Sequence, residues 1–251
     1  MKRESRRFVT PLAILAALAS ACGGAGDQAR KGAGAEDKKA PEATAVEINQ
    51  LAREELQDGG TLRWPLTQMP SNFNTSHLDG TLADGSAVMD AMLPRLFNFD
   101  SSAQPSPNRD YVLSAELTSK VPKQVVTYKI NPKASWHDGA PITIADFEAH
   151  WKARNGTNED FKVASTQGYD KIESVVAGSD EREVVVTYAT PYADWQGLFS
   201  NLYPLSTNRD PAVFNDGWKE RPLNTAGPFK LDNVDPTAKT ITLVRNEKWW
   251  G

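Results

Sequence analysis

The side chains that could do chemistry in this chain are few. Its 251 residues include one cysteine, three histidines and 32 acidic residues. Asp146 and His150 lie four residues apart, and on a helix this spacing places two possible metal ligands on one face. His137 stands directly before Asp138, and Cys22 is the only thiol. These groups offer two possible metal-ligand pairs and one site for thiol modification.

Further support for metal binding or catalysis is lacking. The sequence has no Gly-x-Ser-x-Gly elbow, no His-Glu-x-x-His motif and no Gly-x-x-x-x-Gly-Lys phosphate loop. Asp138 precedes Gly139, Ala and Pro, which is typical of a turn. Asp146 and His150 fall opposite the apolar residues of their expected helix, so we expect both on its solvated face. No carboxylate pair has a spacing that marks a glycosidase dyad. We predict no metal site, no cofactor and no enzyme activity.

The residues before Cys22 indicate what its thiol is for. A head with four basic residues is followed by an almost wholly apolar run at 8–21. Those 14 residues would span about 21 Å as a helix, short of the roughly 30 Å hydrocarbon core of a bilayer. A basic head with a short apolar body is typical of an export signal. We therefore predict a signal peptide at 1–21.

The letters Leu-Ala-Ser-Ala-Cys at 18–22 resemble the bacterial lipobox. In such signals the thiol takes a diacylglycerol and the cysteine becomes the new N-terminus. The alternative is an ordinary signal peptide beside a stray cysteine. Phe8 follows the arginine pair at 6–7 immediately, which favours the general secretory route over twin-arginine export. We expect Cys22 to anchor the protein on the extracytoplasmic face of the cell membrane.

The stretch after Cys22 has the composition of a tether. Residues 23–60 include no Phe, Trp or Tyr and are rich in Gly, Ala, Lys, Asp and Glu. Such a stretch buries too little apolar surface to offset chain ordering, so we predict a flexible lipidated tether at 22–58. Residues 1–21 hold four basic residues and one acidic residue, so their removal changes the net charge from −4 to −7. An acidic surface disfavours nucleic acid as a partner.

The remaining residues predict alternating strands and helices. Apolar spacing, turn residues and capping signals carry these assignments. In chain order we expect a strand at 59–66, a helix from an N-cap at Ser86 toward Pro94, a strand at 125–130, a helix opened by a capping box of Thr143 and Asp146, a hairpin at 171–190, a helical and then looped stretch at 192–206, and two strands within 227–250 joined by an Asp-Pro turn. The irregular order indicates a mixed α/β fold.

Two stretches are similar to the signature of the family 5 extracellular solute-binding proteins, the oligopeptide and dipeptide receptors of ABC importers. The first is a strand, a Trp-x-Asp-Gly turn and a helix start; its matching residues are Trp136, Asp138, Gly139, Pro141, Thr143, Asp146 and Phe147. The second is a Gly-Pro-aromatic strand followed by Arg-Asn and an aromatic pair; its matching residues are Gly227, Pro228, Phe229, Arg245, Asn246, Trp249, Trp250 and Gly251. We expect these residues to serve the fold: the tryptophans pack, and Gly139 and Gly227 meet backbone requirements.

The resemblance implies an α/β, two-lobed fold like that of periplasmic binding proteins. Residues 59–96 and 191–251 would form a discontinuous first lobe, and residues 97–190 an inserted α/β subdomain. The second lobe of the family follows later in the chain, so we expect it to be missing from this sequence. The resemblance also implies a monomer.

The resemblance further implies capture of a peptide or similar small solute and its delivery to an ABC permease with its ATPase. The segment after the first strand would offer its backbone to an extended ligand, with His77, Asp79, Gly80 and Thr81 in contact. An Asp-Gly pair is also common in plain surface turns, which stays open as an alternative. The other functions weighed are a non-transport envelope lipoprotein that assists or regulates glycolipid assembly and, third, a lipid-anchored hydrolase.

Overall fold

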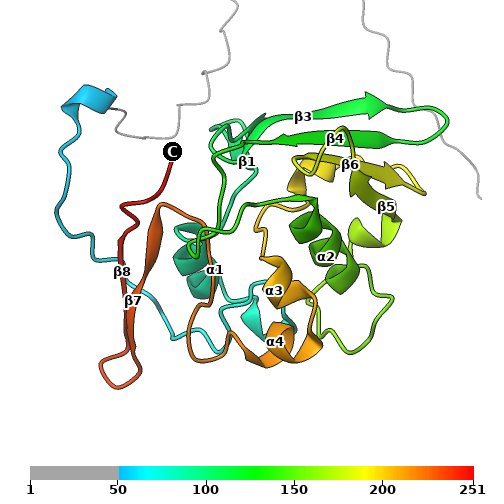
Figure 1. Cartoon of the computed structure of the whole chain (residues 1–251). Coiled ribbons are helices and arrows are strands. Elements are labelled where there is room, and N and C mark those ends of the chain that lie inside the picture. The colour runs from blue at the N-terminus through cyan, green and yellow to red at the C-terminus, as the bar shows by residue number, and fades with distance from the viewer. Residues whose placement is uncertain (1–50) are drawn as a thin grey trace, which may run out of the picture. The chain divides into compact units, whose positions relative to one another are not determined.

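The computed structural model describes residues 51–251 (Figure 1). The predicted signal peptide, Cys22 and tether residues 22–50 lie outside the described residues. The elements in chain order are η1 (Arg53–Glu55), η2 (Leu78–Gly80), α1 (Ala83–Asp90), β1 (Phe97–Phe99), β2 (Pro105–Pro107), β3 (Val112–Ser119), β4 (Val125–Ile130), α2 (Ile144–Arg154), η3 (Tyr169–Lys171), β5 (Ile172–Ala177), β6 (Glu183–Tyr188), η4 (Trp195–Gly197), α3 (Leu205–Asn208), α4 (Pro211–Asp216), β7 (Phe229–Asp235) and β8 (Thr240–Arg245), where η marks a 3₁₀ helix.

A four-stranded antiparallel sheet forms one layer, with strand order β3-β4-β6-β5. The central strands β4 and β6 are rich in valine and tyrosine, and alternate side chains of each point to one face. That face is buried: Val126, Tyr128, Val184 and Val186 are all fully enclosed. Helix α2 contacts β5 and β6 and lies under this layer (Figure 1). The core of this part therefore lies between the sheet and α2.

Most of the predicted strands are confirmed. The strand at 125–130 is β4, the hairpin at 171–190 is β5 and β6, and the last two strands are β7 and β8. Strand β3 was not expected from the sequence. It is an edge strand with two register irregularities against β4, and its buried and exposed residues do not alternate cleanly. Its sequence therefore lacks the period-two pattern that marks a strand.

Helix α2 begins as predicted, with a capping box. Thr143 is the N-cap, and its backbone N–H donates to Asp146 Oδ2 at 2.9 Å. The prediction that Asp146 and His150 lie on a solvated face is wrong, because they are 4% and 0% exposed. The sheet covers one side of α2, and α3 with the chain leading into it covers the other (Figure 1). Because α2 is enclosed on two sides, it buries polar residues that its apolar periodicity predicts to be exposed to solvent.

A second apolar cluster lies between α1, the β7–β8 hairpin and the loops around them. Its fully buried members are Phe73, Met89, Met92, Leu93, Tyr203 and Trp218. Helix α1 begins at Ala83, so the prediction of an N-cap at Ser86 is wrong. Asp84 in its first turn accepts hydrogen bonds from Thr67 and Gln68. The helix therefore starts about one turn earlier than predicted, at the point where the Asp84 carboxylate binds residues 67 and 68.

Two other expectations are not met. Residues 59–66 form no strand, and Leu62 and Trp64 are 84% and 69% exposed. Within residues 51–251 no strand pairs with them. Their alternating pattern therefore has no neighbouring strand to supply the backbone hydrogen bonds of a sheet. The stretch at 192–206 is mostly irregular, with only the short η4 and the start of α3. No helix in the described part of the chain is long and apolar enough to cross a membrane.

Candidate ligand-binding segment

The residues predicted to meet a ligand fall within residues 72–81, here called the 72–81 segment. It begins with two consecutive Asx turns. Asn72 Oδ1 accepts from the backbone N–H of Asn74 at 2.9 Å, and Asn74 Oδ1 accepts from that of Ser76 at 3.1 Å. Both asparagines are buried. An asparagine readily bonds the backbone two residues on, so the sequence Asn-Phe-Asn encodes this paired turn.

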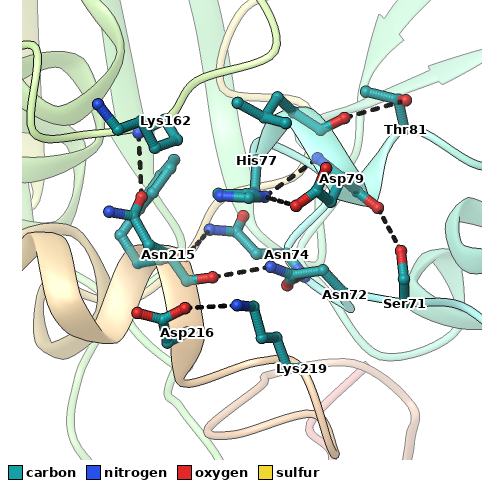
Figure 2. Close-up of polar contacts among 12 residues, drawn as sticks. Ser71, Asn72, Asn74, His77, Asp79, Thr81, Lys162, Asn215, Asp216 and Lys219 are labelled. Carbon is teal, nitrogen blue, oxygen red and sulfur yellow. Dashed lines mark hydrogen bonds and ion pairs between the residues drawn. The ribbon is translucent and has the colours of Figure 1, made fainter.

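The same two asparagines also cap helix α4. Their side-chain nitrogens donate to the last carbonyls of that helix: Asn72 to Asn215 O at 2.9 Å, and Asn74 to Phe214 O at 2.8 Å (Figure 2). These carbonyls have no partner within a helix. Neither asparagine was predicted to have a role, although their repeat at alternate positions, 72 and 74, is a signal for such turns.

Further contacts fix the backbone of the 72–81 segment. The hydroxyl of Tyr203 donates to Phe73 O at 2.9 Å and accepts from the N–H of Thr75 at 2.8 Å. Phe73 N–H donates to Trp218 O. On the other side, Leu78 N–H donates to the carbonyl of Lys162. The segment is therefore held by side chains and backbone from three distant parts of the chain.

His77 belongs to this internal framework. It is 4% exposed, and its Nδ1 accepts from the backbone N–H of Asp79 at 3.0 Å. Nδ1 lies 3.8 Å from the Asp79 carboxylate. Burial lowers the pKa of His77 below its ordinary 6.5, while Asp79 opposes that shift. The ring is thus neutral at pH 7 and caps η2 as an acceptor.

Gly80 is buried, and its surroundings leave no room for a side chain. A Cβ at this position would lie 1.9 Å from the backbone oxygen of Asn74. By contrast, the side chain of Asp79 is 54% exposed and Thr81 faces solvent. The four predicted residues are therefore neighbours with two geometries. His77 and Gly80 build the segment, and Asp79 and Thr81 are free to meet another molecule.

The residues of the two sequence motifs meet at one place, around Gly227. The carbonyl of Gly227 lies 3.1 Å from His137 Nε2 and 3.4 Å from Asn246 Nδ2. Asp138 accepts from the side chain of Asn224 at 2.8 Å. A Cβ on Gly227 would lie 2.5 Å from Ala91 O. The motifs thus bring three parts of the chain into contact: the turn at 136–141 before α2, the end of α1 and the β7–β8 hairpin.

The remaining motif residues also contact the protein itself. Trp136 is 3% exposed in the larger core, and Gly139 has a φ of +90°, which favours glycine. Pro228 accepts from the N–H of Asn246 at 2.8 Å. Trp250 donates to Asp110 O at 2.6 Å and meets Tyr111 edge-on. These contacts are those of packing and turn residues.

A hollow lies away from the 72–81 segment. It has a volume of about 1360 Å³ and lies between residues 56–66, α1 and β8. Its lining includes Leu62, Trp64 and Phe229, all of them exposed. No residue predicted to bind ligand lines it. Within residues 51–251 no group of three or more His, Cys, Asp or Glu residues could hold a metal ion.

Residues 113–251, which carry both motifs, match the model of the "Bacterial extracellular solute-binding proteins, family 5 Middle". This chain belongs to the family 5 solute-binding proteins. The match covers more than half of the sequence and includes the sheet, α2 and the β7–β8 hairpin. The family assigned from the motif residues is therefore confirmed.

Relatives of this family 5 chain include two curated proteins of Mycobacterium tuberculosis. The "Oligopeptide-binding protein OppA" is 42% identical over 97% of this chain and 41% of the relative. The "Probable monoacyl phosphatidylinositol tetramannoside-binding protein LpqW" is 33% identical over 71% of this chain and 29% of the relative. The chain thus spans about two fifths of the length of OppA. Both names describe binding proteins and not enzymes.

The solved structures show the same fold. The "Periplasmic EDTA-binding protein EppA" matches with a TM-score of 0.69 and 33% identity, over 74% of this chain and 36% of that chain. The predicted class, a mixed α/β fold of the periplasmic-binding-protein type, is confirmed. The position of a ligand on this chain stays a prediction.

Proposed function

We propose that this family 5 protein captures peptides outside the cell membrane and delivers them to an ABC importer, made of a permease and an ATPase. The observation that carries this proposal is the 42% identity to an oligopeptide-binding protein over nearly the whole chain. The protein would act as a monomer and need no cofactor. Nothing in its acidic charge favours nucleic acid as a partner.

The geometry of the 72–81 segment supports a role in ligand contact. Its backbone is held rigidly, which limits the ordering cost of binding. The exposed carboxylate of Asp79 can pair with the amino group of a peptide in a charge-assisted hydrogen bond. We place this segment in a first lobe made of residues 59–96 and 191–251, with 97–190 inserted. The buried members of the smaller cluster around Met92 and Trp218 all come from the two first-lobe ranges, which supports that lobe. The larger cluster joins residues of 97–190 to Trp195, Phe199 and Leu202 of the first lobe.

Peptide capture is tested with the whole protein, expressed from its complete reading frame, by calorimetry against a defined peptide mixture. Asp79→Asn removes the charge but keeps the side-chain shape. We expect it to weaken binding of free-amine peptides about 10- to 100-fold, since hydrogen bonds to charged groups contribute about 1.5–3 kcal/mol. Peptides with an acetylated N-terminus should bind the wild type and the Asp79→Asn variant with the same affinity.

The matched control is Asp232→Asn, which removes an exposed carboxylate on β7. It should leave the affinity unchanged. Normal peptide binding by the Asp79 variant would remove this segment from the ligand site. A wild-type protein that binds no peptide in the mixture would contradict the proposed function itself.

We also propose that Cys22 carries the lipid that anchors the protein. In a bacterial host, wild-type protein should enter the detergent phase on phase partitioning, and Cys22→Ser should move to the aqueous phase. The reason is that a diacylglycerol contributes about 0.8 kcal/mol for each buried CH₂ group. Equal partitioning of the two proteins would contradict lipidation.

The second candidate function is assistance or regulation of envelope glycolipid assembly. The relative LpqW, named as a phosphatidylinositol tetramannoside-binding protein, supports it at 33% identity. Vesicles that contain a mannosylated phosphatidylinositol, compared with vesicles of plain phosphatidylinositol, separate the two functions. Selective binding to the mannosylated vesicles, without peptide binding, would favour this candidate.

A further inference from the structure

His150 lies in a buried polar cluster that no part of the proposed ligand contact uses. Its ring is fully enclosed on helix α2. Nε2 lies 3.2 Å from the hydroxyl of Tyr169 and 3.5 Å from Nη1 of Arg154. Nδ1 lies 3.4 Å from the side-chain nitrogen of Asn208 on α3. Each ring nitrogen therefore has a polar neighbour.

These contacts require a neutral ring. The side-chain nitrogen of Asn208 also donates to Tyr203 O, so it faces Nδ1 as a donor and Nδ1 accepts. The ring proton then lies on Nε2, where the hydroxyl of Tyr169 accepts it; Nη1 of Arg154, 3.5 Å away, is itself a donor and makes no hydrogen bond to this nitrogen. Burial lowers the pKa of His150 well below 6.5, and the nearby guanidinium of Arg154 lowers it further. The other titratable side chains that face the ring are Tyr169, whose hydroxyl contacts Nε2, and Tyr203, whose ring stacks on it while its hydroxyl points to Phe73 and Thr75. Asp146, one turn earlier, accepts from Thr143 and Leu205 and does not contact the ring.

Asn208 connects this cluster to the 72–81 segment. The amide nitrogen that faces His150 also donates to the carbonyl of Tyr203 at 3.1 Å. The hydroxyl of Tyr203 holds Phe73 O and the N–H of Thr75. The side-chain oxygen of Asn208 is buried and has no hydrogen-bond partner among the described residues. Because this oxygen makes no hydrogen bond, the amide of Asn208 can rotate into a second orientation without breaking a bond of its oxygen.

We propose that His150 is an acid-sensitive switch for the 72–81 segment. A proton on Nδ1 would face the donor nitrogen of Asn208, and two donors cannot share a hydrogen bond. Asn208 then rotates its amide so that Oδ1 accepts from the protonated ring. That rotation withdraws the donor from Tyr203 O, and Tyr203 loosens its hold on Phe73 and Thr75. The link to ligand release rests on the proposed function.

The direction of the pH response follows from linkage. The closed cluster disfavours the proton, whereas an opened, hydrated His150 takes it up near pH 6.5. Acid therefore favours the open form, and the coupling is absent above about pH 7. Between pH 7.5 and 5.5 the open population should rise about tenfold, because one pH unit below the ordinary pKa corresponds to a factor of ten.

The test is amide hydrogen exchange of the whole protein without ligand, read by NMR at Thr75, whose N–H is bonded to the Tyr203 hydroxyl, and corrected for the intrinsic pH dependence. Exchange at this amide should rise about tenfold from pH 7.5 to 5.5. His150→Gln should abolish the rise. His137→Gln and His77→Gln remove the other two described histidines and should preserve it. Because no ligand is present, failure of this test leaves peptide capture intact.

Three results would overturn the switch: a flat wild-type response, a rise that persists in His150→Gln, or a rise that only His77→Gln removes. If His150→Gln does not fold, the ring nitrogen shifts of His150 in the wild type replace it. The ring must then take up its proton with the same midpoint as the rise in exchange. A different midpoint would also overturn the proposal.

Discussion

Gly80→Ala is expected to destabilise the protein by about 3 kcal/mol or more, at the upper end of the cost of overpacking a rigid site. The added methyl group would lie 1.9 Å from the carbonyl oxygen of Asn74. That oxygen is backbone and accepts from the N–H of His77. Asn74 is also tied to helix α4. The overlap therefore cannot be relieved by a side-chain rotation. Thermal unfolding measured by circular dichroism gives the change in stability.

Gly197→Ala is the matched control for this substitution. Gly197 is the exposed last residue of η4, and no atom would lie within 4 Å of its added Cβ. Its replacement should change the stability by no more than about 0.5 kcal/mol. Equal stability of the two variants would show that the chain around Gly80 can move apart. The same result would make Gly80 a usable position for probing ligand contact.

Asp146→Ala is expected to cost about 2 kcal/mol, because it leaves two part-buried donors without a partner and such a donor costs about 1–3 kcal/mol when fully buried. The carboxylate accepts from Thr143 N–H at 2.9 Å and from Leu205 N–H at 2.8 Å. It thereby joins the start of α2 to the start of α3. Burial raises the pKa of Asp146, so ionising it subtracts stability as the pH rises past 3.8. Urea unfolding at pH 7 measures the net loss.

Glu148→Ala removes a carboxylate from the same helix, two residues further on. Glu148 is partly exposed and pairs with Lys152 at 2.6 Å. A surface pair four residues apart contributes only about 0.3–0.5 kcal/mol. The two variants thus differ mainly in burial. If they were equally stable, Asp146 would not connect α2 to α3 in solution.

Local signals predicted the elements whose formation depends on their own residues. The capping box at Thr143 and Asp146 starts α2, and the valine-rich runs form β4 and β6. The edge strand β3 was missed because its partner, and not its own pattern, makes it a strand. Residues 59–66 have the pattern but no strand beside them within the described chain.

The ligand contact of the candidate site stays a prediction, and its internal construction could not be predicted from the sequence. The sequence pointed to His77, Asp79, Gly80 and Thr81, and the structure places these four side by side. It gave no means of seeing that His77 and Gly80 face inward, because their neighbours come from residues 74, 163 and 214. His150 was assigned to water for the same reason. Periodicity describes one helix, whereas burial depends on what packs against it.

The capping of α4 by Asn72 and Asn74 has a consequence for the order of synthesis. The hydrogen bonds of these side chains span 143 and 140 residues of sequence. At about 5–20 residues per second, the carbonyls they need are made about 7–30 s after the asparagines themselves. Until then both amides remain hydrated or bonded to temporary partners. A chaperone or secretion factor that keeps the nascent chain open through that interval would favour correct pairing, and the segment proposed to meet the ligand is among the last to take its shape.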